Sequence, residues 1–189
     1  FTRGIGPDHP LVALIPGMSH STLALPASDR GWILCSGGTE IARDADLRTL
    51  VGNRSDVLVA FPSASVSTFV AELPPVEEAL YESMIRAQVD KRGLSGKSSA
   101  LIDYERIDRN ERGETFAVRV VADPPADTIL PTAGGYQTSA DLRGAVTPGA
   151  GALIWREHGR LILGVYIGGI PAHVQILSGK PELGKTLAS

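Results

Sequence analysis

Short apolar runs bounded by glycine, proline or polar residues divide the chain into predicted strands. A continuous apolar run is typical of a strand buried on both faces, and alternation is typical of a strand buried on one face. Residues 57–61 are the clearest continuous run, because all five are apolar. The expected strands comprise residues 11–15, 21–25, 31–36, 56–61, 66–73, 100–107, 115–121, 152–157, 160–167 and 170–177.

Turn residues indicate how these strands are connected. Pro16-Gly17 joins the first two strands into a hairpin, and the polar turn 108–113 joins residues 100–107 to 115–121. Arg119 alternates with apolar residues in the latter strand, which predicts one buried and one solvent-facing side. The pairs His158-Gly159 and Gly168-Gly169 connect the last three strands into a meander.

Two segments show helical periodicity. We expect a short helix at residues 41–51, with Leu47 and Leu50 facing inward. A longer helix is expected between Pro74 and Gly93, since proline favours the first turn and glycine the stop. Its inward face is predicted to contain Val76, Leu80, Met84 and Ala87. Pro181 resembles the beginning of a further helix, so we expect a fragment of a longer protein.

The order of these elements predicts an α/β architecture with an internal duplication. Two blocks each open with three antiparallel strands followed by a helix. We expect a first α/β subdomain at 1–122 and the start of a second at 152–189, a meander plus an incomplete helix. Residues 123–151 are rich in Pro, Gly, Thr and Ala, which indicates a connector, with one helical turn near residues 141–143.

Composition and charge narrow the classes of partner. The chain has 189 residues, 43% hydrophobic and 21% charged, with a formal net charge of -3. Its Lys and Arg residues are scattered, which argues against a nucleic-acid-binding surface. No apolar run approaches the roughly 20 residues that a membrane span requires. The single cysteine, Cys35, excludes an internal disulfide and indicates a reducing compartment.

Motifs that carry chemistry are incomplete. Residues 93–98 end in Gly-Lys-Ser, but Lys91 occupies the position where a phosphate loop requires glycine. Gly149 and Gly151 precede a strand and could cradle phosphate through backbone N–H groups, although such segments are more often simple turns. The histidines show no metal-ligand spacing, and no serine lies in a nucleophile elbow. We therefore predict no catalytic residue and no metal site.

The pattern resembles the actin-fold assembly proteins of type IV pili and type II secretion, the PilM and GspL cytoplasmic-domain families. The strand at 57–61 and its Pro62-Ser63-Ala64-Ser65 turn are similar to a strand and turn of these proteins, and residues 77–88 to their helix. Residues 102–105, 116–121 and 151–177 resemble their following strands and second meander. The resemblance implies an actin-like (ribonuclease H-like) α/β fold: a mixed β-sheet with flanking helices.

The resemblance also indicates where a nucleotide would bind. Nucleotide-binding members carry an Asp-x-Gly phosphate turn in the first hairpin, whereas residues 13–19 contain no acid. The second phosphate turn falls between Trp155 and Leu161 and lacks the usual small-residue Asp-Gly pattern. Because a Mg²⁺–nucleotide site needs carboxylates near the phosphates, we expect no cofactor, with ATP and Mg²⁺ as the alternative. The phosphate-turn candidates are Gly17, Ser19, Gly149, Gly151 and Gly159.

These features favour a non-catalytic cytoplasmic scaffold in a pilus or secretion platform at the inner membrane. The resemblance implies binding to the cytoplasmic segment of an inner-membrane protein, to an assembly ATPase, or to a second copy of the chain. One alternative is an active ATPase or kinase of the actin-like superfamily. Another is a small-ligand-binding α/β domain, which predicts an enclosed apolar pocket, whereas a scaffold predicts an exposed edge strand or groove.

Overall fold

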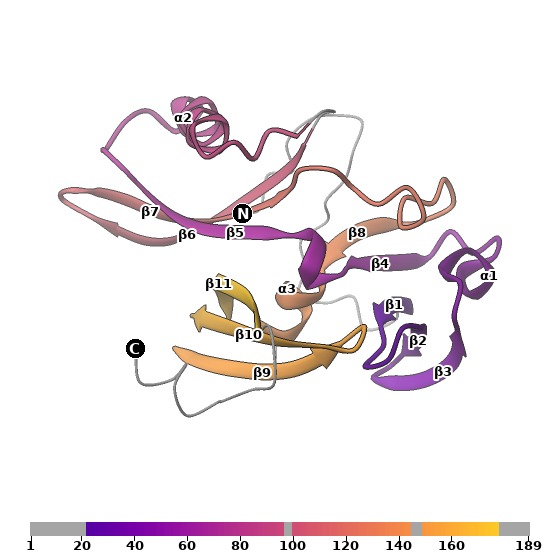
Figure 1. The fold of residues 1–189 in the computed structure, drawn as a ribbon. Helices are drawn as coiled ribbons and strands as arrows, with labels where there is room; N and C mark the ends of the chain where they lie inside the picture. Colours follow the sequence, from indigo (N-terminus) through magenta and orange to yellow (C-terminus); the bar gives the residue numbers. More distant parts are fainter. Residues whose placement is uncertain (1–21, 97–99, 145–148, 178–189) are drawn as a thin grey trace.

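The computed structural model describes residues 22–96, 100–144 and 149–177. The expected strand at 11–15, the Pro16-Gly17 turn and the helix at Pro181 lie outside these ranges. The described residues form three β-sheets, each with its own helix. Figure 1 shows how the three sheets lie relative to one another.

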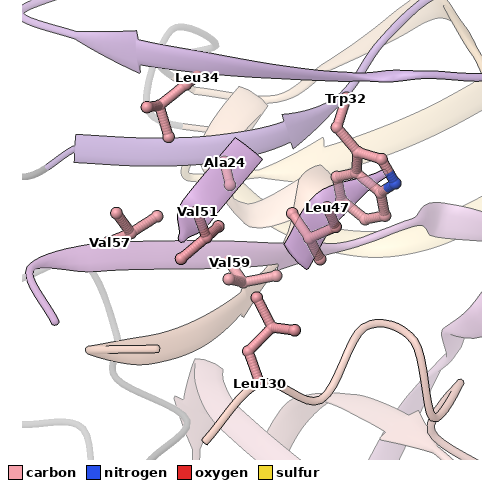
Figure 2. Close-up of a cluster of buried hydrophobic side chains, with 8 residues drawn as sticks. All are labelled: Ala24, Trp32, Leu34, Leu47, Val51, Val57, Val59 and Leu130. Carbon is pink, nitrogen blue, oxygen red and sulfur yellow. The ribbon is translucent and has the colours of Figure 1, made fainter. Parts of the chain in front are cut away.

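The first sheet has five strands in the order β3-β2-β1-β4-β8. Its central pair, β1 and β4, is parallel, as are β4 and β8, whereas β2 and β3 run antiparallel to their neighbours. Helix α1 packs against it through the apolar cluster of Figure 2. The elements are β1 (Thr22–Pro26), β2 (Trp32–Ser36), β3 (Thr39–Asp44), α1 (Leu47–Val51), β4 (Val57–Phe61) and β8 (Gly135–Thr138). The strand predicted at 57–61 is confirmed as a fully buried strand.

The second sheet has the order β5-β7-β6 and is covered on one side by α2 (Figure 1). The strands are β5 (Ser67–Leu73), β6 (Leu101–Asn110) and β7 (Gly113–Val121), and the helix α2 spans Glu78–Lys91. The predicted hairpin is confirmed, but its strands extend further and leave only Glu111 and Arg112 in the turn.

The third sheet is the predicted meander, β11-β10-β9. It comprises β9 (Gly151–Glu157), β10 (Arg160–Ile167) and β11 (Ile170–Leu177). Helix α3 (Ser139–Gly144) lies between this sheet and the second one in Figure 1, and Ala140 packs with Trp155, Ile162 and Tyr166. The Val174 N–H donates to Thr68 Oγ1 at 2.7 Å, which joins β11 to β5.

The helix predicted at 41–51 is wrong over its first half. Gly37 and Gly38 both have positive φ angles, 57° and 79°, and reverse the chain into the edge strand β3. Ile41 lies on that strand and is 51% exposed. The helix begins only after Asp46, whose carboxylate accepts the Thr49 N–H at its N-terminus.

The inward face predicted for the longer helix is displaced by one position. Leu80 is 48% exposed, and Ala87 is exposed. The buried row instead consists of Tyr81, Ile85 and Val89, with Val76 and Met84 at its border. Both rows have helical spacing, at intervals of three or four residues, so periodicity alone does not distinguish the buried face. Contact with the second sheet determines which face of α2 is buried, because the Tyr81 ring packs on Phe116 at 5.0 Å between centroids.

Arg119 and the segment 123–151 both differ from the sequence expectation. Arg119 is 4% exposed, because β7 is covered by α2 on one face and faces α3 and β11 on the other. The stretch 123–151 is more than a connector, since it contains β8, which pairs in parallel with β4 in the first sheet. The helical turn expected near residues 141–143 is confirmed as α3.

Candidate functional site

The carboxyl ends of the parallel strands β1, β4 and β8 meet at one edge of the first sheet. The turn 27–31 follows β1, Pro62-Ser63 follows β4, and Ser139 follows β8. In open α/β sheets, ligands bind at this edge. Here the β9–β10 turn reaches the same edge from the third sheet, as Figure 1 shows.

The two turns are joined directly by hydrogen bonds. The His158 N–H donates to the Ala27 carbonyl at 2.8 Å, and the Gly159 N–H donates to the Ser28 carbonyl at 2.9 Å. His158 Nε2 lies 3.0 Å from the Gly31 carbonyl oxygen, and its ring meets Trp32 edge-on at 5.2 Å. The backbone N–H groups that could cradle a phosphate in this turn therefore already have protein acceptors.

Glu157 lies just before this turn and is 2% exposed. Its carboxylate accepts four hydrogen bonds, from donors on three separate segments. Ser63 donates through its backbone N–H and its hydroxyl (3.0 Å), the Ser139 hydroxyl donates at 3.0 Å and Trp155 Nε1 at 2.9 Å. Both carboxylate oxygens thus bind the protein itself and tie β9 to the ends of β4 and β8.

The hairpin that faces the β9–β10 turn is β1–β2, and its turn contains the acid Asp29. Residues 13–19, where the first phosphate turn was expected, lie outside the described residues. Asp29 Oδ1 accepts the Gly31 N–H at 3.0 Å, and Oδ2 pairs with Arg43 at 3.1 Å. The hydrogen bond from Gly31 is the main cause that lowers the pKa of the exposed Asp29 carboxyl. Asp29-Arg30-Gly31 has Asp-x-Gly spacing, but this carboxylate serves the turn and Arg43.

The other phosphate-turn candidates do not converge. Gly151 begins β9, whereas Gly159 follows its far end, so about seven residues of strand, roughly 20 Å, separate them. Gly149 has a φ of 84°, and its carbonyl accepts the Gly169 N–H at the β10–β11 turn. Gly17 and Ser19 lie outside the described residues, as do Lys97 and Ser98 of the Gly-Lys-Ser segment.

An open cleft of about 700 Å³ lies beside the joined turns. Arg30, His158 and Arg160 from the turns line one part of it, and Asp127 and Thr128 from the β7–β8 connection line another. Trp32, Pro62, Ala64 and Ile162 contribute apolar surface. The cleft is therefore mixed in character rather than the enclosed apolar pocket expected for a small-ligand domain.

A second polar cluster connects the second sheet to α3. Arg119 pairs with Asp103 (Nε–Oδ2 2.9 Å), lies 3.3 Å from Asp141 and 3.7 Å from Glu105. Burial raises the pKa of Asp141 and of Glu105, and Arg119 opposes both shifts. The cross-strand register, which places Asp103 opposite Arg119, brings the first pair together. Asp103 and Glu105 are two positions apart on β6, so strand alternation places them on one face, but it does not reveal that they share Arg119 as a partner.

Within the described ranges, no group of three or more His, Cys, Asp and Glu side chains is arranged to hold a metal ion. Cys35 is half-buried, and burial raises the pKa of its thiol. Across the same ranges, no helix combines the length and apolar character needed to cross a bilayer.

Comparison with known sequences gives a limited result. No protein-family model matches the chain. It is 29% identical over 155 residues to the Holliday junction branch migration complex subunit RuvB of Corynebacterium jeikeium (strain K411). That alignment covers 80% of this chain but only 43% of RuvB, so the chain spans less than half the length of this relative.

Comparison with solved structures identifies the fold. The cytoplasmic domain of EpsL, an inner membrane component of the type II secretion system of Vibrio cholerae, matches with a TM-score of 0.53 and 12% identity. The match covers 85% of this chain and 71% of that domain. The PilM-PilN type IV pilus biogenesis complex matches with a TM-score of 0.47 and 14% identity, over 64% of this chain and 42% of that one. The chain has the fold of the EpsL cytoplasmic domain, which confirms the predicted actin-like α/β class.

Proposed function

We propose that this chain is a non-catalytic, cytoplasmic scaffold of a pilus or secretion platform at the inner membrane. Its partners would be the cytoplasmic segment of an inner-membrane protein and an assembly ATPase. The shared fold with the EpsL cytoplasmic domain motivates the platform assignment.

The direct contact between the two turns supports the non-catalytic part of the proposal. A phosphate placed between them would compete with the Ala27 and Ser28 carbonyls for the His158 and Gly159 N–H groups. Anion sites of this kind need free, convergent N–H donors. A nucleotide would therefore have to separate two hydrogen-bonded turns before it could bind.

The acids at these turns, Asp29 and Glu157, also support the proposal that the chain is not an ATPase. An ATPase would need carboxylates that face a shared Mg²⁺–phosphate group. Glu157 instead accepts four protein donors, and Asp29 accepts the Gly31 N–H and Arg43. Both oxygens of each carboxylate therefore already bind groups of the protein itself.

A calorimetric titration of the full-length protein with Mg·ATP, paired with a phosphate-release assay, tests this part. We expect no binding tighter than about 1 mM, which corresponds to roughly 4 kcal/mol, and no release above the buffer rate. Submillimolar binding accompanied by phosphate release would replace the scaffold with an ATPase.

Fractionation of the producing cells tests the platform part. The tagged full-length protein should sediment with inner-membrane vesicles, because its proposed partner is anchored there. After the membranes are solubilised with detergent, the protein should co-elute with its partner from a size-exclusion column. A protein found wholly in the cytosol, with no membrane-bound fraction, would contradict a role at the membrane.

A further inference from the structure

We propose that the cleft beside the joined turns binds an acidic segment of a partner protein, with Arg30 and Arg160 pairing with its carboxylates. This inference rests on the scaffold function proposed above and specifies the binding site and the chemistry of the partner. The segment would lie along the cleft between the turns and the β7–β8 connection.

The contact between the turns brings the two arginines to the same cleft. Arg30 precedes Gly31, whose carbonyl contacts His158 Nε2 at 3.0 Å. Arg160 follows Gly159, whose N–H donates to Ser28. Because these hydrogen bonds fix one turn against the other, both side chains line the same space although they are 130 positions apart in the sequence.

The exposed side chains that line the cleft carry more positive than negative charge. Arg43, Arg86 and Arg106 each pair with a carboxylate, whereas Arg30 and Arg160 form no ion pair with any described residue. Glu157 also lines the cleft, but it is buried and its carboxylate accepts four hydrogen bonds from neutral donors. Asp127 is then the one exposed lining acid, against two exposed arginines. Arginine pairs with carboxylates in a planar, often bidentate geometry.

The remaining lining favours a peptide over a small anion. Trp32, Pro62 and Ile162 offer apolar surface that a free phosphate or carboxylate ion cannot use. The turn N–H groups, which would bind a phosphate, already donate hydrogen bonds to the Ala27 and Ser28 carbonyls. A volume of about 700 Å³ accommodates a few side chains of an extended segment. An acidic peptide with apolar residues between its carboxylates uses both kinds of surface.

Fluorescence anisotropy with a labelled six-residue peptide of alternating Glu and Leu, titrated with the full-length protein, tests this proposal. The variant Arg30→Gln/Arg160→Gln should bind about tenfold more weakly, since each lost charge-assisted contact weakens binding several-fold. The matched control is Arg112→Gln, an exposed arginine in the β6–β7 turn. It should bind as the parent does. Affinity should also fall as salt rises, because exposed charges are screened.

Three results would overturn the proposal: unchanged peptide binding in the double variant, equal binding of a Lys-Leu peptide, or displacement of the peptide by millimolar phosphate. The last result would identify a site for small anions. A melting curve of each variant establishes that the exposed substitutions leave the fold intact. If the peptide test fails and Mg·ATP does not bind, the scaffold proposal still holds but this binding site is wrong. If the protein hydrolyses ATP, the scaffold proposal itself is wrong.

Discussion

Ser63 and Glu157 are 94 positions apart in the sequence, yet the Ser63 hydroxyl donates to Glu157 Oε2 at 3.0 Å and its backbone N–H donates to Oε1. Ser63 follows β4 of the first sheet, and Glu157 ends β9, the first strand of the third sheet along the chain. This buried pair therefore links two sheets that share no strand. It also occupies the carboxylate that would otherwise be available to a ligand.

Glu157→Gln should lower the free energy of unfolding by about 2–4 kcal/mol, because buried hydrogen bonds to a charged group are lost and donors lose an acceptor. The amide has one acceptor oxygen, and its NH₂ group would face N–H and O–H donors. Urea unfolding measures the change. Glu111→Gln in the exposed β6–β7 turn is the control and should change stability by less than about 0.5 kcal/mol. Similar stabilities of the two variants would show that the Glu157 hydrogen bonds contribute little.

Ile85→Ala should destabilise the protein by about 2–5 kcal/mol, because it leaves a cavity between α2 and the second sheet. Ile85 is fully buried there among Tyr81, Val89 and the β-strand side chains. Leu80→Ala on the same helix is the control, since Leu80 is largely exposed. It should cost about 0.5 kcal/mol or less. A larger loss at Leu80 than at Ile85 would restore the inward face that periodicity predicts.

Gly164→Ala should destabilise the third sheet by about 1–3 kcal/mol through overpacking. A Cβ at this position would lie 2.8 Å from ring atoms of both Trp155 and Tyr166. Val165→Ala is the neighbouring control, because Val165 is 37% exposed on the other face of β10. Thermal unfolding compares the two. An unchanged melting temperature for Gly164→Ala would mean that the two rings can separate freely.

Asp141→Asn should change the pH dependence of stability. Burial raises the pKa of Asp141 above its ordinary value of 3.8, although Arg119 opposes the shift. A carboxyl with a raised folded-state pKa stabilises the fold fully below its unfolded pKa, and this contribution is lost as the pH rises through the folded pKa. Asparagine does not ionise, so the variant avoids this loss.

We therefore expect the stability of Asp141→Asn relative to the parent protein to improve as the pH rises above about 4. Urea unfolding at several pH values measures it. Because the substitution also removes the Arg119 ion pair, a constant offset between the two curves is expected as well. Parallel profiles over the whole range would contradict the raised pKa.

The local sequence pattern predicted most of the strands and failed where a strand has no alternation of apolar and polar residues. The runs at 57–61, 115–121 and 152–177 contain apolar residues at strand spacing and turn residues at their ends, so they were predicted correctly. Residues 39–44 have no buried apolar face, because β3 is an exposed edge strand, and the sequence pattern assigned residues 41–44 to a helix instead. The short strand β8 lies in a segment rich in Gly, Pro and Thr, where no periodicity exists to detect.

The candidate site was located only in part. The His158-Gly159 turn was predicted correctly, and both residues have positive φ angles, 47° and 74°. Its contact with Ala27 and Ser28 could not be predicted, since backbone hydrogen bonds between distant turns leave no residue-type signal. The same holds for the convergence of Ser63, Ser139 and Trp155 on Glu157.

The sequence by itself determined most strands and turns of the described chain, the long helix, and the α/β class, because these follow from apolar spacing and turn chemistry over a few residues. Tertiary structure decided which helix face is buried, where Arg119 lies and what each carboxylate binds. These depend on contacts between segments that lie from 22 to 106 positions apart, so burial and hydrogen-bond partners are set by tertiary packing rather than by local sequence.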